Sequence, residues 1–198
     1  PIYFDNSVFD IYSTFFSGGT LISVSEQTAR NPLKLLDLLY KKSCNIFFSV
    51  PSLLIFMLNI NSIKKEKMKS IKKLIFGGEP FPISKLRILF DLLNENTKFY
   101  NVYGPTECTC ICSSYILSKE DFKNYDKIPP IGKINPNYEW FIGSSEDDVK
   151  LKMFEGELHL SGPCVGSGYF NDLNLTQKKF LNIKKSDNQI KVFYNTGD

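Results

Sequence analysis

Short apolar runs of strand length alternate with amphipathic segments of helix length over the first half of this 198-residue chain. The runs expected to form strands cover residues 20–24, 45–50, 73–77 and 98–102. Apolar residues at helical spacing predict helices over residues 7–16, 31–40, 51–58 and 84–93. Strand–helix–strand repeats with short links are typical of an α/β fold with a doubly wound, mostly parallel sheet. The uninterrupted apolar run at 45–50 favours a strand that is buried on both faces.

The pattern changes beyond Lys119, where the chain becomes polar and rich in turn residues. Short alternating runs then predict strands over 138–142, 149–153, 157–161 and 190–194, and a short helix over 176–181. Such short strands are typical of a smaller β-rich, barrel-like subdomain. We therefore expect an α/β part over residues 1–127 and a β-rich part over residues 128–198.

Composition narrows the class of protein. A hydrophobic content of 42% with 14% aromatic residues is enough for a globular core. A mean hydropathy of −0.16 and the lack of an apolar run of membrane length predict a soluble protein without a membrane partner. The net charge of +3 comes from lysines mixed with acids, without interleaved arginine and aromatic residues, so no nucleic-acid partner is expected.

The five cysteines indicate a reducing, cytoplasmic compartment, because their number is odd and no C-x-x-C pair occurs. Cys108, Cys110 and Cys112 alternate in and beside a predicted strand over 109–117, so they should point to one face. We interpret them as buried small apolar residues, since a zinc site would usually add a second Cys or His pair. His159 is the sole histidine, which excludes a Ser-His-Asp or multi-histidine site within these residues.

The segment Asn101-Val102-Tyr103-Gly104-Pro105-Thr106-Glu107 follows the last predicted strand of the first half. Its Gly-Pro pair forces a turn, and the hydroxyl of Thr106 and the carboxylate of Glu107 follow at once. A turn of this kind presents polar groups to a phosphate and its metal. Gly77-Gly78-Glu79 ends another strand in a similar way. Because ligands bind at the carboxyl ends of parallel strands, we expect the two turns to share one cleft.

Four segments of the chain, taken together, resemble the consecutive core motifs of one enzyme family. They are Phe4-Asp5-Asn6-Ser7, the segment 101–107, the segment from Gly156 to Gly162 with Gly168-Tyr169, and Tyr194-Asn195-Thr196-Gly197-Asp198. In order and spacing they are similar to the amino-acid adenylation (AMP-binding) domains of nonribosomal peptide synthetases, within the acyl-adenylate-forming superfamily. The chain starts without Met and ends abruptly, so it looks like an internal piece of the large N-terminal subdomain. The phosphate loop and the C-terminal lid subdomain are expected outside it, and this piece alone is not expected to be active.

The resemblance implies an ATP-dependent ligase that activates an amino acid as aminoacyl-AMP and releases pyrophosphate. The acyl group would then pass to the phosphopantetheine thiol of a carrier protein. Glu107 is implied to hold Mg²⁺, and Thr106 to donate to the α-phosphate, so these two are the candidate catalytic residues. Tyr103 would stack on adenine, Asn101 would bond its exocyclic amine, and Asp198 would accept the ribose hydroxyls. The implied cofactor-binding residues are Gly78, Asn101, Tyr103, Gly104, Thr106 and Asp198.

Asp5 carries the most information about the substrate. The resemblance implies that its carboxylate pairs with the α-ammonium group of an amino acid, whereas aryl-acid activators usually have another residue there. The alternative is an Asp favoured by the dipole at the start of a helix. The side-chain pocket implied by the family is uncharged and predicts an apolar substrate such as Val, Ile or Leu. Its residues are Asn6, Phe9, Phe48, Ile75, Gly77, Val102, Cys110 and Ile111.

Two departures from the family motifs leave alternatives open. Ser167 stands where the third motif usually has Arg, and Asn195 stands where the last motif commonly has Arg or Lys. Both changes remove positive charge near the expected nucleotide. The alternatives are an acyl- or aryl-CoA ligase of the same superfamily, which Asp5 disfavours, and a degenerate module that keeps the fold without catalysis.

Overall fold

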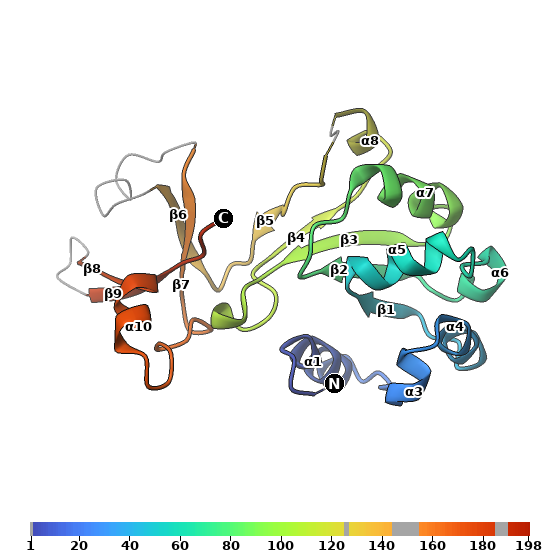
Figure 1. Cartoon of the computed structure of the whole chain (residues 1–198), viewed down its shortest axis with the longest axis horizontal. Helices are drawn as coiled ribbons and strands as arrows, with labels where there is room; N and C mark the ends of the chain where they lie inside the picture. Colours follow the sequence, from blue (N-terminus) through green and yellow to red (C-terminus); the bar gives the residue numbers. More distant parts are fainter. Residues whose placement is uncertain (1, 125–126, 144–154, 185–189) are drawn as a thin grey trace. The chain divides into compact units, whose positions relative to one another are not determined.

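The computed structural model describes residues 2–124, 127–143, 155–184 and 190–198, which form two compact units (Figure 1). Unit 1 comprises Pro1–Tyr103 and Ser113–Lys133, and unit 2 comprises Gly104–Cys112 and Ile134–Asp198. The chain therefore leaves unit 1 after Tyr103 and returns to it at Ser113. The expected division between residues 127 and 128 stays a prediction.

The sheet of unit 1 has five strands in the order β1-β2-β3-β4-β5. Three parallel strands come first, and β4 then runs antiparallel to β3. The strands are β1 (Ile46–Ser49), β2 (Lys73–Gly77), β3 (Lys98–Tyr103), β4 (Ser113–Ile116) and β5 (Lys133–Ile134). The predicted α/β class is confirmed. The sheet is mixed, and its parallel strands β1, β2 and β3 are those predicted over residues 45–50, 73–77 and 98–102.

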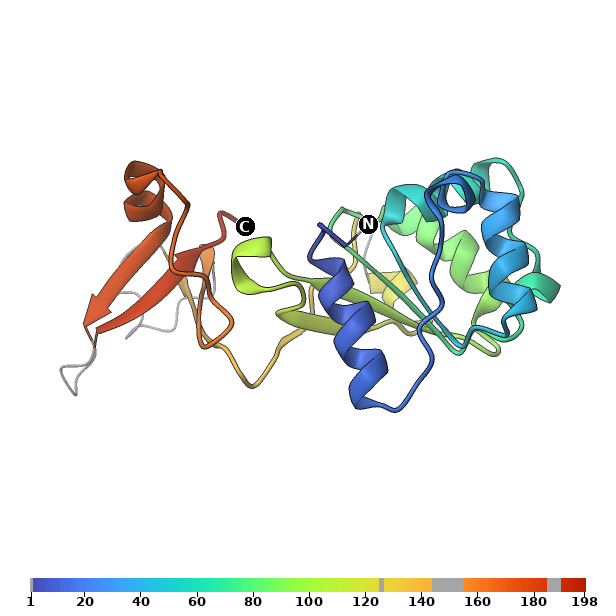
Figure 2. The same cartoon turned by 90° about the horizontal axis from the view of Figure 1, so that it is seen from below.

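Helices lie on both faces of this sheet (Figure 2). Phe47, Leu74, Phe76 and Phe99 point to one face and pack into the main core with side chains of the larger helices. Those helices are α4 (Pro32–Lys41), α5 (Pro51–Asn59) and α7 (Ile83–Leu93), with the shorter α6 (Lys65–Met68) beside them. On the opposite face, Phe9 contacts Phe48 edge-on with ring centroids 5.2 Å apart.

The helix that carries Phe9 runs from Asn6 to Phe16, as α1 (Asn6–Val8), a π-helical turn η1 (Phe9–Ser13) and α2 (Thr14–Phe16). The predicted helix over 7–16 is therefore confirmed. The short α3 (Glu26–Ala29) follows, and its start is capped by Ser25, whose Oγ accepts from the Thr28 N–H. Asn31 caps α4 in the same manner and Pro32 occupies its first turn, as the sequence predicted.

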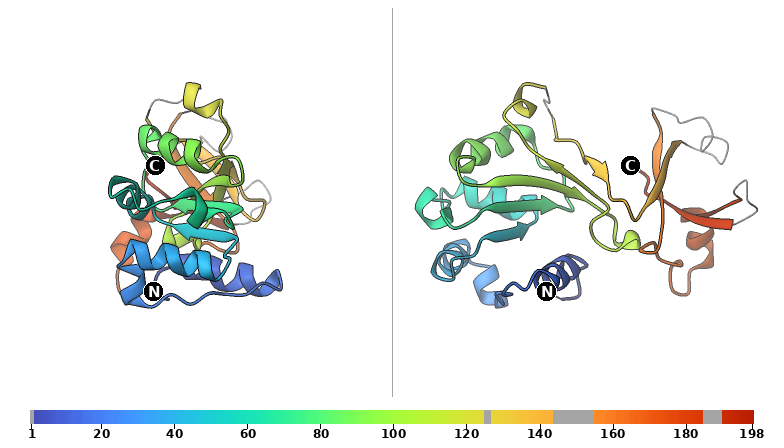
Figure 3. Two further views of the ribbon diagram at one scale, coloured as in Figure 1. Left: turned by 90° about the vertical axis from the view of Figure 1, so that its right-hand side faces the viewer. Right: turned by 180° about the vertical axis from the view of Figure 1, so that it is seen from behind.

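Unit 2 contains a second, four-stranded sheet in the order β6-β7-β9-β8, shown in orange and red in Figure 3. Its strands are β6 (Glu139–Gly143), β7 (Glu157–Ser161), β8 (Phe180–Lys184) and β9 (Ile190–Asn195), all paired antiparallel. The predicted strands at 138–142, 157–161 and 190–194 are confirmed. The strand predicted over 149–153 lies outside the described residues. His159 is buried and stacks on Phe141, with ring centroids 4.4 Å apart.

Two strand predictions were wrong. Residues 20–24 pair with no strand among the described residues, and Leu21 and Val24 remain exposed, so the apolar pattern alone did not make a strand. The strand predicted from Thr109 begins only at Ser113, because Thr109 and Cys110 adopt positive φ angles of 59° and 70°. A 3₁₀ turn, η2 (Thr106–Cys108), precedes them.

Three further predictions need correction in detail. Cys108, Cys110 and Cys112 do not alternate along a strand, although all three are buried as expected. β1 lies at the edge of the described sheet and Ile46 is exposed, so it is not buried on both faces. The predicted helix over 176–181 is α10 (Leu173–Lys179), because its last two residues belong to β8. The polar segment after Lys119 contains a short helix, α8 (Asp121–Asn124).

Replacing Leu86 with Ala is expected to destabilise the protein by about 2–5 kcal/mol, because this fully buried α7 side chain would leave a cavity in the core. The measurement is the free energy of unfolding in urea. Leu33→Ala is the matched control, since Leu33 on α4 is 61% exposed and should cost about 0.5 kcal/mol or less. Equal losses for the two variants would contradict the placement of the core.

Candidate functional site

The carboxyl ends of β2 and β3 approach each other closely at Gly77. A Cβ atom at this position would lie 2.3 Å from the Val102 carbonyl oxygen and 2.7 Å from its Cγ2, so only glycine fits. Gly78 follows with φ of +83°, which turns the chain sharply after the strand. Beyond it, the Glu79 carboxylate accepts hydrogen bonds from the N–H and Oγ of Ser52, in the first turn of α5. The turn after β2 is therefore held against the start of α5.

Asn101 on β3 is almost fully buried, and its position is fixed by one hydrogen bond. Its side-chain Nδ2 donates to the Pro130 carbonyl at 2.8 Å. The amide oxygen Oδ1 is the acceptor atom of this side chain, and it is the atom that a ligand N–H would address. Tyr103 ends the strand and is half-buried.

Most of the residues predicted to bind the amino acid gather in unit 1, on the sheet face opposite the main core. Phe48 pairs with Ile75 across β1 and β2, and Gly77 pairs with Val102 across β2 and β3. Phe9 covers Phe48 from the helix above this face. The structure thus brings these five residues to one uncharged face. Asn6 lies on the same helix as Phe9, whereas Cys110 and Ile111 belong to unit 2.

Asp5 lies immediately before α1 and is half-buried. At this N-cap position a carboxylate commonly accepts a hydrogen bond from the helix backbone, but the Asp5 side chain makes no such bond. Within the described residues it has no ion-pair or hydrogen-bond partner. The Asp5 carboxylate therefore does not cap α1 in this structure.

In unit 2, the turn that carries Thr106 and Glu107 closes tightly on itself. A Cβ atom at Gly104 would lie 1.6 Å from the Cys110 carbonyl oxygen, so the two backbones are in direct contact. The Gly166 N–H donates to the Glu107 carbonyl at 2.7 Å, and Thr109 Oγ1 donates to the Cys164 carbonyl at 2.8 Å. The loop around residues 162–169 therefore fixes the backbone of this turn.

The Glu107 carboxylate accepts a hydrogen bond from the Tyr169 hydroxyl at 2.5 Å, and the Tyr194 hydroxyl lies 3.4 Å from that of Tyr169. Burial by itself raises the pKa of Glu107. Hydrogen bonds from Tyr169, from its own backbone N–H and from Tyr194 outweigh burial, and the charge of Lys179 adds to them. The pKa of Glu107 therefore lies below its ordinary value of 4.5, and the group is ionised at neutral pH.

The last motif is attached to β7 by its backbone. Leu158 donates its N–H to the Asp198 carbonyl at 2.8 Å and accepts from both the N–H and the Oγ1 of Thr196. The Asp198 N–H in turn donates to Thr196 Oγ1 at 3.1 Å, and the Asp198 residue is exposed at the end of the sheet. These bonds fix the backbone around Asp198, to which the family resemblance assigns a ribose contact.

Tyr169 and Lys179 acquire contacts here that the sequence motifs did not reveal. Lys179 Nζ donates to the Asn195 carbonyl at 3.4 Å and lies 3.2 Å from where a Cβ of Gly197 would be. It thus brings a cation to the motif in which Asn195 replaces the usual basic residue. Tyr169 lay within a recognised motif, but its bond to Glu107 spans 62 residues and leaves no local pattern.

Thr106 and Glu107 offer the hard oxygen donors that suit Mg²⁺. Across the part of the chain that the structure describes, no group of three or more His, Cys, Asp or Glu residues is arranged to hold a metal ion. Mg²⁺ is commonly held by one or two carboxylates together with phosphates and water. Among the described residues, no helix is long and apolar enough to cross a membrane.

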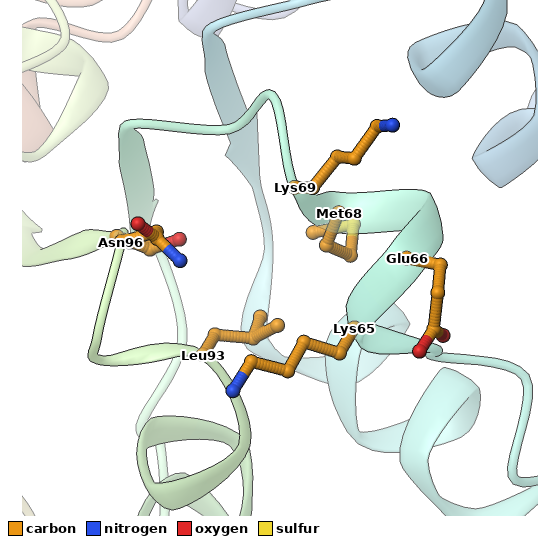
Figure 4. A pocket seen from close by; sticks show the side chains of 7 residues that line it. Lys65, Glu66, Met68, Lys69, Leu93 and Asn96 are labelled. Atoms are coloured by element: carbon orange, nitrogen blue, oxygen red, sulfur yellow. The ribbon is translucent and has the colours of Figure 1, made fainter.

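A cavity of about 230 Å³ lies in unit 1 beside α6 (Figure 4). Its lining contains none of the predicted site residues: Lys65, Glu66, Met68, Lys69, Leu93, Asn96 and Thr97. Lys65 forms an ion pair with Glu95 at 2.5 Å, and both side chains are largely exposed. This cavity adds nothing to the candidate site.

Substituting Gly104 with Ala is expected to destabilise the protein by about 1–3 kcal/mol or more, because the new methyl group overlaps the Cys110 backbone. The free energy of unfolding measures the effect. Gly166→Ala is the control, because its Cβ would meet only the Glu107 carbonyl oxygen, at an ordinary contact distance of 3.4 Å. A Gly104 variant as stable as the Gly166 variant would show that the turn is not closed in this way.

Glu107→Gln is expected to lower the free energy of unfolding at pH 7 by about 1 kcal/mol. This is less than the usual contribution of a hydrogen bond to a charged group, because Glu107 is partly exposed and solvent screens its charge. Since the native pKa of Glu107 is depressed, its stabilising effect is present above 4.5 and is lost as the pH falls through the native pKa. The difference in unfolding free energy between wild type and variant should therefore shrink in acid. Unfolding measured at pH 7 and at steps below 4.5 tests this, and a difference independent of pH would contradict it.

Sequence comparison finds a family with matching residues over most of the chain. The profile described as "AMP-binding enzyme" matches residues 1–170. A D-alanine–D-alanyl carrier protein ligase from Bacillus licheniformis is 30% identical over 198 residues, covering 100% of this chain and 38% of the relative. An L-proline–[L-prolyl-carrier protein] ligase from Pseudomonas fluorescens is 32% identical over 171 residues, covering 86% of this chain and 34% of the relative. The chain thus spans little more than a third of these relatives.

Solved structures share the fold at lower identity. PA1221, a nonribosomal peptide synthetase protein containing adenylation and carrier-protein domains, superposes with a TM-score of 0.79 at 21% identity, covering 100% of this chain and 39% of PA1221. The Vibrio cholerae adenylation domain AlmE, solved with glycyl-adenosine-5′-phosphate, gives a TM-score of 0.78 at 23% identity, with 98% and 36% coverage. At this identity the likeness shows the fold alone.

Proposed function

This chain belongs to the AMP-binding enzyme family, and on that premise we propose that it is part of a ligase that activates an amino acid with ATP. In the proposed reaction, an oxygen of the amino-acid carboxylate attacks the α-phosphate of ATP. A bond forms between that oxygen and phosphorus, the bond from the α-phosphorus to the β-phosphate bridging oxygen breaks, and pyrophosphate leaves. The product is an aminoacyl-AMP.

The observation that carries the proposal is the half-buried carboxylate of Asp5, which has no partner among the described residues and precedes Phe9 by about one helical turn. An amino acid offers an ammonium group for Asp5 and a side chain for the surface formed by Phe9, Phe48, Ile75 and Val102. A simple acyl or aryl acid would leave the Asp5 carboxylate unpaired in a half-buried position, which costs free energy. The relatives named for D-alanine and L-proline support a small or apolar amino acid. We propose Val, Ile or Leu, because the predicted pocket carries no charge.

The residues that the family motifs single out are proposed to bind the nucleotide. In unit 1, the Asn101 Oδ1 accepts from the adenine amine, Tyr103 stacks on the base, and the Gly78 backbone passes beside it. In unit 2, Gly104 allows the turn to form, Thr106 donates to the α-phosphate, and Asp198 accepts the ribose hydroxyls. Glu107, kept ionised by its hydrogen bonds, is proposed to hold Mg²⁺, which supplies charge neutralisation for the phosphates.

The second half of the proposed reaction transfers the aminoacyl group to a carrier protein. The phosphopantetheine thiol of the carrier attacks the acyl carbon, a thioester forms, and AMP leaves. Support comes from the two carrier-protein ligases among the relatives and from the structure that includes a carrier domain. The order of the four motifs favours nonribosomal peptide synthesis in the cytoplasm as the setting.

Asp5→Ala in the intact ligase is expected to reduce kcat/KM for the amino acid about 100-fold in ATP–pyrophosphate exchange. Loss of one partner of a charge pair costs about 2–5 kcal/mol, and each 1.4 kcal/mol is about tenfold. The KM for ATP should stay unchanged, because Asp5 is not proposed to touch the nucleotide. Asp91→Ala on α7 is the matched control, since Asp91 is exposed and forms only a surface ion pair with Arg87.

The same variant separates the amino-acid ligase from an acyl or aryl ligase. The carboxylic acid that lacks the α-amino group should react equally poorly with the wild type and with Asp5→Ala. If the wild type instead prefers the acid without the amine, the acyl- or aryl-ligase alternative is correct. If Asp5→Ala activates the amino acid undiminished, the pairing with ammonium is wrong. Absence of ATP binding by the intact wild type would favour a degenerate module.

A further inference from the structure

The Glu107 carboxylate is held by two tyrosines that come from distant parts of unit 2. The Tyr169 hydroxyl donates to Glu107 Oε1 at 2.5 Å, and the Tyr194 hydroxyl lies 3.4 Å from it. Both rings pack against Phe180, with centroid separations of 5.6 Å for Tyr169 and 5.1 Å for Tyr194. These two residues, called the tyrosine pair below, therefore have ring positions set by packing and hydroxyls directed at the carboxylate.

The chain around Tyr169 is built to deliver its hydroxyl to this place. Gly168 has a φ of +141°, and a Cβ there would lie 2.5 Å from Thr176 Cγ2, so a side chain would push the loop away from α10. The Tyr169 N–H donates to Thr176 Oγ1 at 2.8 Å. On the other side of the contact, the Gly166 N–H holds the Glu107 carbonyl at 2.7 Å. Both the donor and the acceptor of the Tyr169–Glu107 bond are thus fixed by backbone contacts.

The tyrosine pair also maintains the charge state of Glu107. Burial and the neighbouring carboxylate raise the pKa of the Tyr169 and Tyr194 hydroxyls, so both stay protonated and act as donors. Donation to Glu107 helps to lower the pKa of its carboxyl group despite partial burial. The Tyr169 hydroxyl contacts Oε1, which is one of the two carboxylate oxygens.

We propose that Tyr169, supported by Tyr194, is a positioning residue that commits Glu107 Oε1 to a hydrogen bond and leaves Oε2 to bind the divalent cation. The inference rests on the proposed function, in which Glu107 holds Mg²⁺ beside the ATP phosphates. Hydrogen bonds to a metal-ligating carboxylate orient it and limit it to one binding geometry, and their removal commonly weakens metal affinity about 10–100-fold. Tyr169 touches neither cation nor substrate in this arrangement and acts through Glu107.

The test uses Tyr169→Phe in the intact ligase, which keeps the ring contact with Phe180 and deletes the hydroxyl. Binding of Mn²⁺ is followed by electron paramagnetic resonance in the presence of α,β-methylene-ATP, so the readout does not depend on turnover. We expect Mn²⁺ affinity to fall about 10–100-fold. In ATP–pyrophosphate exchange, the Mg²⁺ concentration for half-maximal rate should rise in parallel, and saturating Mg²⁺ should restore most of the rate.

Tyr115→Phe is the matched control. The Tyr115 hydroxyl also donates to a carboxylate at 2.5 Å, that of Asp121, but in unit 1, so its loss should leave the Mn²⁺ affinity unchanged. Tyr194→Phe should give a smaller loss of affinity than Tyr169→Phe, because its hydroxyl contacts the Tyr169 hydroxyl at a longer distance. If Tyr169→Phe does not fold, the Tyr194 variant carries the test.

The outcomes separate the inference from the proposed function. A wild type that exchanges pyrophosphate, together with a folded Tyr169→Phe of unchanged Mn²⁺ affinity, overturns the positioning role and leaves the function intact. A loss of affinity equal in Tyr115→Phe and Tyr169→Phe would also overturn it. A wild type that binds neither α,β-methylene-ATP nor Mn²⁺ in its presence refutes the proposed function itself.

Discussion

The parallel register of β1, β2 and β3 determines what each face of the first sheet carries. Phe47 pairs with Leu74, and Leu74 with Phe99, so these side chains all point into the core under α4, α5 and α7. Because side chains alternate along a strand, the next residues necessarily point to the opposite face. A slip of one residue would exchange the two sets. The packing of the core therefore also aligns the uncharged face to which we assign the amino acid.

At the carboxyl end of β2, a glycine allows the neighbouring strand β3 to approach closely. At Gly77 the backbone of β3 lies too near for any side chain, and the chain then turns through Gly78. The consequence is a strand end at which the backbone is accessible beside the Asn101 amide and the Tyr103 ring. A flat base and its exocyclic amine suit such a surface, which is why the adenine contacts are proposed there.

Unit 2 combines buried apolar side chains with polar contacts between distant segments. Phe141, Ile183 and Phe193 form one hydrophobic cluster, with Leu181 beside them. The turn that carries Glu107 is held by hydrogen bonds from the loop around Gly166 and Tyr169, while Thr196 ties the last motif to β7. Residues from three of the motifs that resemble the adenylation family therefore meet within unit 2 through bonds that span tens of residues. Lys179 adds a positive charge at the motif where Asn195 lacks one.

The sequence by itself determined the alternation of strands and helices, the membership of the α/β class and the order of the motifs, because these follow from local periodicity and spacing. The resemblance of the motifs also singled out Asp5 and Glu107 as candidate binding residues. Tertiary structure decided which expected strands formed: residues 20–24 have no partner among the described strands, and positive φ angles keep Thr109 and Cys110 out of β4. It also decided that Tyr169 and Lys179 approach Glu107 and Asn195, since contacts between distant residues depend on packing and leave no periodic trace in the sequence.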